Sequence, residues 1–237
     1  MFGGLKKRFW TDVDIVPVDG GYGVALDGRA VKTPAKSRLV MPSESLAGKV
    51  AEEWRAIAGE IDPAVLHYTR LCNASIDKVV PQYDDIVVML AAYGETDLLC
   101  HRAESPDGLI KRQSEVWDPI LRWARQSHRL LFTIVVGILP GDQPGESVEK
   151  LAEWLRKANN FELMALHDLT TISGSIVLAR AVSDGFLDPQ SAWAASRLDE
   201  VWQAEHWGQD SQAVQAARLK EAEFMRAADM LSMLREG

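Results

Sequence analysis

Apolar and polar residues alternate along the first forty positions, which is the pattern of half-buried β-strands. Residues 13–17 and 22–26 alternate in this way, and Asp27-Gly28 is a strong signal for a two-residue hairpin between a second and a third strand. Residues 31–33 continue the third strand, and residues 38–41 offer a fourth. The pattern therefore predicts an antiparallel β-meander.

After these residues, apolar side chains no longer recur at every second position but at every third or fourth. Leu46, Val50, Trp54 and Ile57 recur at helical intervals after Pro42-Ser43, which ends the sheet and offers a helix cap. This stripe predicts an amphipathic helix that lies on one face of the sheet.

Beyond about residue 69 the pattern is mainly helical. Asp62-Pro63, Asp118-Pro119 and Asp188-Pro189 each combine a capping side chain with a proline suited to the first helical position, and so mark helix starts or turns. Residues 130–136 are β-branched and aromatic and favour a buried strand instead. The expected helical segments are 82–93, 109–128, 146–158, 161–184, 189–206 and 210–235.

The length of 237 residues and a hydrophobic content of 47% are enough for one or two domains with a sizeable core. We expect an α+β N-terminal domain, an antiparallel β-meander plus a helix, over residues 1–80. A larger, mainly α-helical domain is expected over residues 81–237, with the boundary placed to within about ten residues.

Charge and cysteine usage restrict the class of protein. The formal net charge is −8, although residues 1–40 carry seven Lys and Arg against four Asp. An acidic chain is a poor partner for nucleic acid. No segment has the ~20 apolar residues of a membrane span, and Cys72 and Cys100 lie in apolar settings that suit free buried thiols. We expect a bacterial cytoplasmic protein, or a mature form in the mitochondrial matrix.

Motifs for catalysis and nucleotide binding are missing. Gly21-Tyr22-Gly23 is followed by Leu26 where a dinucleotide fingerprint needs glycine, and Gly48-Lys49 lacks the glycine of a phosphate loop. No histidine stands in a zinc or di-iron helical pattern. Ser173-Gly174-Ser175 lacks the flanking glycines of a nucleophile elbow and suits close helix packing better. We expect no enzyme, cofactor, metal or nucleotide site.

Residues 66–77 place polar groups on an apolar helix. Arg70, Asn73 and Asp77 follow one another at i, i+3 and i+7 and so share a face. A solvated face with an internal ion pair and a binding surface both account for this arrangement.

A second candidate surface lies in residues 198–207. Asp199 and Glu200 occupy the polar side of this helix, Glu205 lies over its apolar side, and Trp207 follows at its end. Acids beside aromatic groups attract a partner that carries Arg or Lys, although an ordinary solvated face is equally open. Trp207, like Trp10, sits at the margin of an element beside charged residues, so we expect both to be exposed.

Taken in order, several segments of the chain resemble the ATP12 family, the chaperones that assemble the F1 sector of ATP synthase. The matching segments are Lys7-Arg8-Phe9-Trp10, residues 22–34, residues 70–77, residues 95–100, Trp117-Asp118-Pro119, Leu198-Asp199-Glu200 and Trp207-Gly208.

The resemblance implies a protein that binds the free α subunit of F1, catalyses nothing and releases α when the β subunit replaces it. It favours Asp199, Glu200, Glu205, Trp207, Arg70, Asn73, Asp77 and Trp10 as partner-binding residues. Of the two glutamates, Glu200 is the better candidate for direct contact, whereas Glu205 suits an internal pair. We expect a monomer.

Two other functions fit the residues alone. One is a small-molecule enzyme with a site built from Arg70, Asp77, Arg102 and the acids of residues 199–205. The other is a scaffold protein that binds a partner without a release step. A concave pocket with perturbed carboxylates would support the enzyme.

Overall fold

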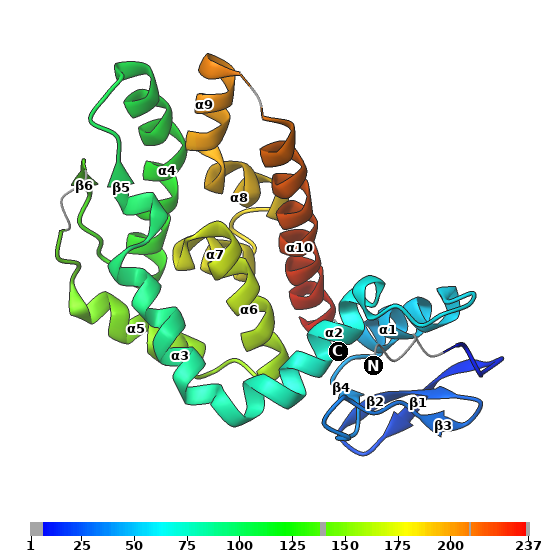
Figure 1. Ribbon diagram of the computed structural model, residues 1–237. Coiled ribbons are helices and arrows are strands. Elements are labelled where there is room, and N and C mark those ends of the chain that lie inside the picture. The colour runs from blue at the N-terminus through cyan, green and yellow to red at the C-terminus, as the bar shows by residue number, and fades with distance from the viewer. Residues whose placement is uncertain (1–6, 138–140, 209, 236–237) are drawn as a thin grey trace. The chain divides into compact units, whose positions relative to one another are not determined.

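The computed structural model describes residues 7–137, 141–208 and 210–235 (Figure 1). The chain divides into two compact units. We call Met1–Tyr83, Asn159–Ala165 and Asp229–Gly237 the N-terminal unit, and Asp84–Ala158 and Leu166–Ala228 the helical unit. The N-terminal unit thus includes two short segments from late in the chain, which no local pattern indicates.

The sheet of the N-terminal unit is antiparallel and centres on its second strand. Strand β1 (Val13–Val18) pairs with β2 (Gly21–Leu26), and both β3 (Arg29–Ala30) and β4 (Val40–Met41) pair with β2. Asp27 and Gly28 have φ of 48° and 75°, as a tight hairpin requires. The meander prediction is confirmed for the first three strands, but β3 ends before residue 31 and β4 returns to β2.

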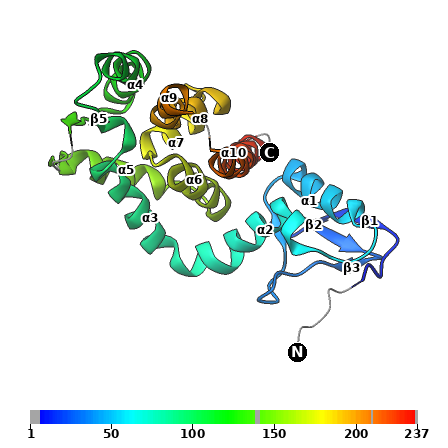
Figure 2. The ribbon, with the colours of Figure 1, turned by 45° about the horizontal axis from the view of Figure 1, so that its top comes forward.

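Helix α1 (Glu44–Ala56) packs on this sheet through contacts with β1 and β2 (Figure 2). Ser43 caps its first turn by accepting a hydrogen bond from the Leu46 amide. Leu46 and Val50 of the predicted stripe are fully buried, so the sequence pattern identified the correct face of the helix.

The segment after α1 is one long run of helical turns with a change of pitch. A 3-10 turn (Pro63–Val65) precedes α2 (His67–Ala74), which continues into a π-helical turn (Ser75–Val79) and a 3-10 turn (Val80–Gln82). Glu53 of α1 accepts hydrogen bonds from the amides of Tyr68 and Thr69 at 2.7 and 2.9 Å. The carboxylate of one helix therefore caps the start of the next.

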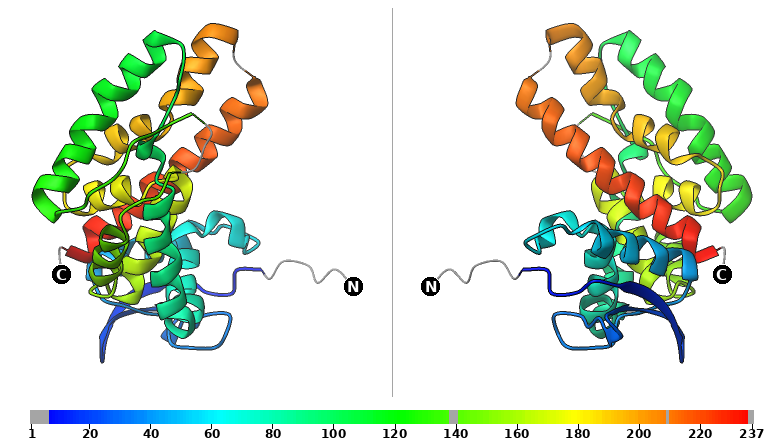
Figure 3. Two further views of the ribbon diagram at one scale, coloured as in Figure 1. Left: turned by 90° about the vertical axis from the view of Figure 1, so that its left-hand side faces the viewer. Right: turned by 90° about the vertical axis from the view of Figure 1, so that its right-hand side faces the viewer.

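The rest of the described chain is mainly helical, as predicted (Figure 3). Two of the expected helices are each broken into two. The segment 161–184 breaks at Gly174, whose φ is 73°, and the segment 189–206 breaks at Arg197. The helices are α3 (Tyr83–Ala92), α4 (Asp107–His128), α5 (Gly145–Leu155), α6 (Asn160–Ser173), α7 (Ile176–Ser183), α8 (Pro189–Ser196), α9 (Leu198–Trp207) and α10 (Ser211–Arg235).

Two expectations about local structure are wrong. Asp118-Pro119 does not start a helix but lies inside α4. Residues 130–136 do not form a buried strand, because only Val135–Val136 (β6) pairs, in parallel with His101–Arg102 (β5). Asp62 and Asp188 do cap a turn and a helix as predicted.

A buried carboxylate joins two parts of the helical unit. Asp97 accepts hydrogen bonds from the Ser175 hydroxyl at 2.8 and 2.9 Å and from the amides of Leu99 and Val177 at 3.0 and 3.1 Å. Burial raises the pKa of Asp97 to about 6, against the opposing effect of these hydrogen bonds. Ser175 follows Gly174 and also caps α7. The turn between α6 and α7 therefore both separates the two helices and places the Ser175 hydroxyl against Asp97.

The two cysteines behave as the sequence indicates. Cys72 and Cys100 are both free and buried, and burial raises the pKa of each thiol. Across the part of the chain that the structure describes, no helix combines the length and the apolar character that a bilayer crossing requires.

Candidate partner-binding surface

Helix α9 presents the strongest candidate surface, which we define as Asp199, Glu200, Val201, Glu205 and Trp207 and call the α9 surface. The helix follows Arg197 and ends at Gly208, whose φ of 93° stops it. Leu198 is buried at its first turn, while the side chains of Val201 and Trp207 stand in solvent. Trp207 is 78% exposed, as expected from its place at the end of an element.

An ion pair fastens α9 to the neighbouring helix α4. The Arg112 guanidinium donates hydrogen bonds of 2.6 and 3.2 Å to the two carboxylate oxygens of Glu205. These bonds lower the pKa of Glu205 and raise the pKa of Arg112. Arg112 also lies 6.0 Å from the centre of the Trp202 ring. Glu205 is therefore engaged within the molecule, in agreement with the internal pairing considered for it.

The other two acids of α9 have different partners. Asp199 accepts a hydrogen bond of 2.8 Å from the Gln113 side chain on α4. Glu200 forms an ion pair of 2.7 Å with Arg197, and about half of its side chain is exposed. A partly exposed pair three residues apart is worth only a few tenths of a kcal/mol (about 0.2–0.5). Glu200 and Glu205 are equally exposed, but Glu200 has a single ion-pair contact close by in sequence, whereas Glu205 accepts two hydrogen bonds from another helix. Glu200 is thus the acid of α9 that is less engaged within the molecule.

Close packing holds α4 and α9 together beneath the exposed side chains. A Cβ atom added to Gly108 at the start of α4 would lie 2.6 Å from Cη2 of Trp202. The glycine therefore allows the tryptophan ring to approach the backbone of α4. Further along α4, the indole of Trp117 is buried and donates a 2.9 Å hydrogen bond to the Ala195 carbonyl.

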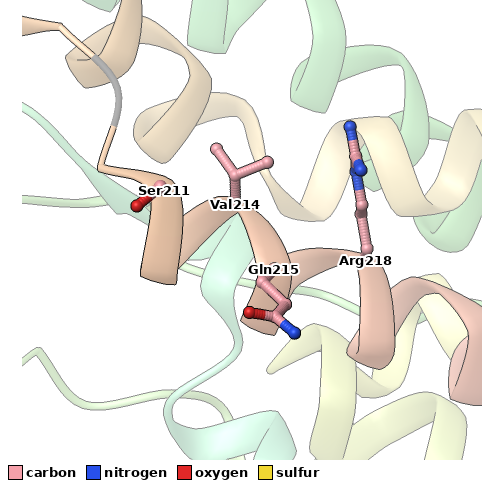
Figure 4. Close-up of a pocket in the computed structure, with 4 residues that line it drawn as sticks. All are labelled: Ser211, Val214, Gln215 and Arg218. Atoms are coloured by element: carbon pink, nitrogen blue, oxygen red, sulfur yellow. The ribbon is translucent and has the colours of Figure 1, made fainter.

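An open hollow of about 540 Å³ lies on the first turns of α10, a few residues after Trp207. Ser211, Val214, Gln215 and Arg218 line it (Figure 4). Within the described residues, no ion pair or hydrogen bond involves the Arg218 side chain. The hollow adds a polar depression next in sequence to the α9 surface.

In the N-terminal unit the structure corrects the expectation for Trp10. This side chain is only 4% exposed, because its ring packs edge-on against Trp54 of α1 at 5.3 Å. The preceding residue, Phe9, is instead 63% exposed. Arg8 donates hydrogen bonds to the carbonyls of Trp10 and Ile57 at 2.9 and 2.7 Å, which fixes the segment against α1.

The three polar residues of the 66–77 segment have separate roles. Arg70 is exposed, whereas the Asp77 carboxylate accepts hydrogen bonds from the Thr33 hydroxyl at 2.7 Å and the Ala35 amide at 3.0 Å. The Asn73 Oδ1 atom is buried and has no hydrogen-bond partner among the described residues. Asp77 lies in the π-helical turn, where α-helical spacing no longer applies. It serves to anchor the loop after β3.

Arg102 of the alternative enzyme site is likewise engaged. Arg102 is 7% exposed, donates to the Leu99 carbonyl at 3.0 Å and pairs with Asp118 at 2.8 Å. Its guanidinium lies 5.1 Å from the Trp117 ring centre. Arg102 thus supports the core of the helical unit. Among the described residues, no group of three or more His, Cys, Asp or Glu is placed to hold a metal ion.

Two contributors to these surfaces escaped the sequence reasoning. Arg112 was missed because its partner, Glu205, lies 93 positions away, and nothing local to α4 indicates the pair. Phe9 was passed over in favour of its neighbour Trp10, since only the fold decides which of two adjacent aromatic rings meets Trp54.

Comparisons with known proteins agree on one family. The model of the ATP12 chaperone protein family matches residues 7–125. Among curated relatives, the mitochondrial protein atp12 of Schizosaccharomyces pombe is 24% identical over 216 residues, which cover 85% of this chain and 74% of the relative.

Solved structures carry the similarity over nearly the whole chain. Atp12 from Paracoccus denitrificans is 40% identical with a TM-score of 0.93, over 96% of this chain and 98% of that one. The Atu1473 protein of Agrobacterium tumefaciens is 38% identical with a TM-score of 0.91, over 97% and 87% of the two chains. Both units therefore have counterparts in chains of the same fold.

Proposed function

Because the chain belongs to the ATP12 chaperone family, we propose that it is an assembly chaperone for the F1 sector of ATP synthase. In this proposal the protein, acting as a monomer, binds the free α subunit and covers the surface that α later presents to the β subunit. It carries out no reaction on the subunit that it binds.

The need for such a protein follows from the physics of subunit interfaces. A subunit that is stable only inside a ring exposes an apolar contact face while it is free, and such a face aggregates unless another protein covers it. A chaperone solves this problem by binding reversibly. It has to bind more weakly than the final neighbour does.

The single observation that carries the proposal for the binding surface is the combination of Trp207, Val201 and Glu200 on one exposed helix. Trp207 and Val201 are large apolar groups held in solvent, and Glu200 supplies a half-exposed carboxylate on the same helix. An interface core of aromatic and aliphatic side chains with a charged rim is the usual arrangement for protein recognition. Glu205, which is also about half exposed, links this helix to α4 through Arg112.

Release by competition is the mechanism that suits this surface. The β subunit binds the same face of α with a larger contact, so added β shifts α from the chaperone into the α–β pair by mass action. No chemical energy enters the exchange. A non-releasing scaffold would instead remain on α after β has bound.

Binding of purified α and β subunits to this protein tests the proposal. Isothermal titration with α is expected to give a one-to-one complex, and titration with β is expected to give no heat of binding. Adding β to the preformed complex should displace this protein from α. Failure to bind α would overturn the proposal, and a stable complex of all three proteins would favour the scaffold.

A further inference from the structure

A second hollow lies on the helical unit, between α4 and the extended residues 130–134, and its lining includes no residue of the α9 surface. Its volume is about 250 Å³, which is enough for one or two large side chains and too small for most free ligands. It is lined by Asp118, Leu121, Arg122, Arg125, Leu130, Leu131, Phe132 and Ile134. We call it the α4 groove.

One wall of the α4 groove is held in place by side chains from outside it. The Ser147 hydroxyl accepts a hydrogen bond from the Leu131 amide at 2.8 Å and donates one to the Leu131 carbonyl at 2.7 Å. The Gln143 side chain does the same for both main-chain groups of Thr133, each at 2.8 Å. The extended wall is therefore supported without a sheet partner, and its backbone cannot collapse onto α4 without breaking these bonds.

The groove is apolar at its base and open at its rim. Leu130 is buried, but Leu131 is 43% exposed and Ile134 is 49% exposed. Adjacent apolar side chains that are held in solvent by a fixed backbone are a frequent mark of a docking surface. The geometry alone leaves the chemistry of the partner open.

The charges around the groove decide that chemistry. Asp118 is neutralised by its 2.8 Å pair with the buried Arg102. Arg122 and Arg125 are exposed, and no hydrogen bond or ion pair to either side chain exists among the residues that the structure describes. The groove therefore carries two unpaired positive charges on a chain of net charge −8.

We propose that the α4 groove is a second docking site for the client subunit, which inserts one or two apolar side chains there and places an Asp or Glu against Arg122 and Arg125. This inference rests on the proposed function. Arginine favours carboxylate partners through paired hydrogen bonds, and the apolar lining requires a protein segment rather than a nucleic acid. Contact at this groove and at the α9 surface would let the chaperone hold one client through two separate sites.

Charge reversal tests the inference with the full chain and purified F1 α. The double variant Arg122→Glu/Arg125→Glu is expected to weaken α binding ten-fold or more, because it turns two attractions into two repulsions. Arg122→Lys/Arg125→Lys keeps the charge but loses the paired hydrogen bonds of the guanidinium, so it should weaken α binding, though less than the charge reversal does. Lys157→Glu/Lys220→Glu is the matched control, since both lysines are exposed, lie outside the groove and produce the same change in net charge.

A photo-crosslinker placed at Leu131 identifies the occupant directly. Mass spectrometry of the cross-linked product should find an α segment in which apolar residues flank an Asp or Glu. If the parent protein binds α while the Arg→Glu double variant and the control bind equally well, or if the cross-linked segment is basic, the groove inference is wrong and the chaperone proposal stands. If the parent protein does not bind α at all, the proposed function itself fails.

Discussion

The Arg112 guanidinium on α4 donates a hydrogen bond to each carboxylate oxygen of Glu205 on α9, at 2.6 and 3.2 Å. The two helices lie side by side, so this pair sets how the exposed end of α9 is presented (Figure 3). Glu205 consequently has an intramolecular role, and Glu200 remains the acid available for a partner. The two glutamates should therefore respond differently to the same substitution.

Glu205→Gln should lower the free energy of unfolding only slightly, by about 0–1 kcal/mol, because the pair is partly exposed. It should also be non-additive with Arg112→Gln, since either change removes the same interaction. Urea unfolding of the two single variants and the double variant measures this coupling. A coupling energy of zero would show that the pair does not link α4 to α9 in solution.

Glu200→Gln should leave the free energy of unfolding within about 0.5 kcal/mol of the parent protein, while weakening α binding ten-fold or more, which is about 1.4 kcal/mol. The loss arises because a carboxylate that a partner desolvates is worth more than one in water. Glu153→Gln on α5 is a suitable control, because Glu153 is also exposed on a helix of the same unit. Equal α binding by the two variants would assign Glu200 to an ordinary solvated surface.

Trp207→Ala should likewise spare folding and reduce binding. The side chain is 78% exposed, so its removal takes away little buried area, whereas an aromatic anchor at an interface is worth about 2 kcal/mol or more. Thermal unfolding and titration with α measure the two effects. Leu219→Ala, another exposed apolar side chain on the helical unit, should change neither. A large fall in melting temperature for Trp207→Ala would instead give the ring a structural role.

Asp97 should give the protein a pH-dependent stability. Burial raises the pKa of Asp97 from its ordinary 3.8 to about 6, so between these values the folded chain keeps a proton that the unfolded chain releases. The contribution of Asp97 is therefore greatest below about pH 4 and falls as the pH rises through 6, by at most about 3 kcal/mol. In Asp97→Asn this titration is removed, so the parent protein should lose stability relative to the variant between pH 4.5 and pH 7. A stability difference that does not change with pH would contradict this assignment.

The fold class follows from local patterns because those patterns report burial directly. The stripe from Leu46 to Ile57 gives one buried face, and the structure buries Leu46, Val50 and Ile57. Alternation over residues 13–26 is followed only in part, because Val13, Val24 and Leu26 are buried whereas Pro17 is exposed. The breaks at Gly174 and Arg197 were missed because apolar spacing continues across them. At Asp118-Pro119 the error is the opposite one. The local signal predicts a helix start, but the structure continues α4 through both residues.

The candidate sites were less predictable, because they depend on contacts between distant residues. Trp10 was expected to be exposed, but the ring of Trp54 covers it. Asp77 was expected to share a face with Arg70, yet the loop after β3 takes up its carboxylate. The exposure of Trp207 was predicted correctly, since the end of a helix beside charged residues leaves little to bury it.

Light scattering during refolding of isolated F1 α tests the central claim most directly. Denatured α is diluted into buffer with increasing amounts of this protein, and aggregation is followed over time. Scattering should fall in proportion to the added protein, reach its minimum near one equivalent, and stay well above that minimum with the doubly substituted Glu200→Gln/Trp207→Ala variant. Equal aggregation with and without the parent protein would contradict the account.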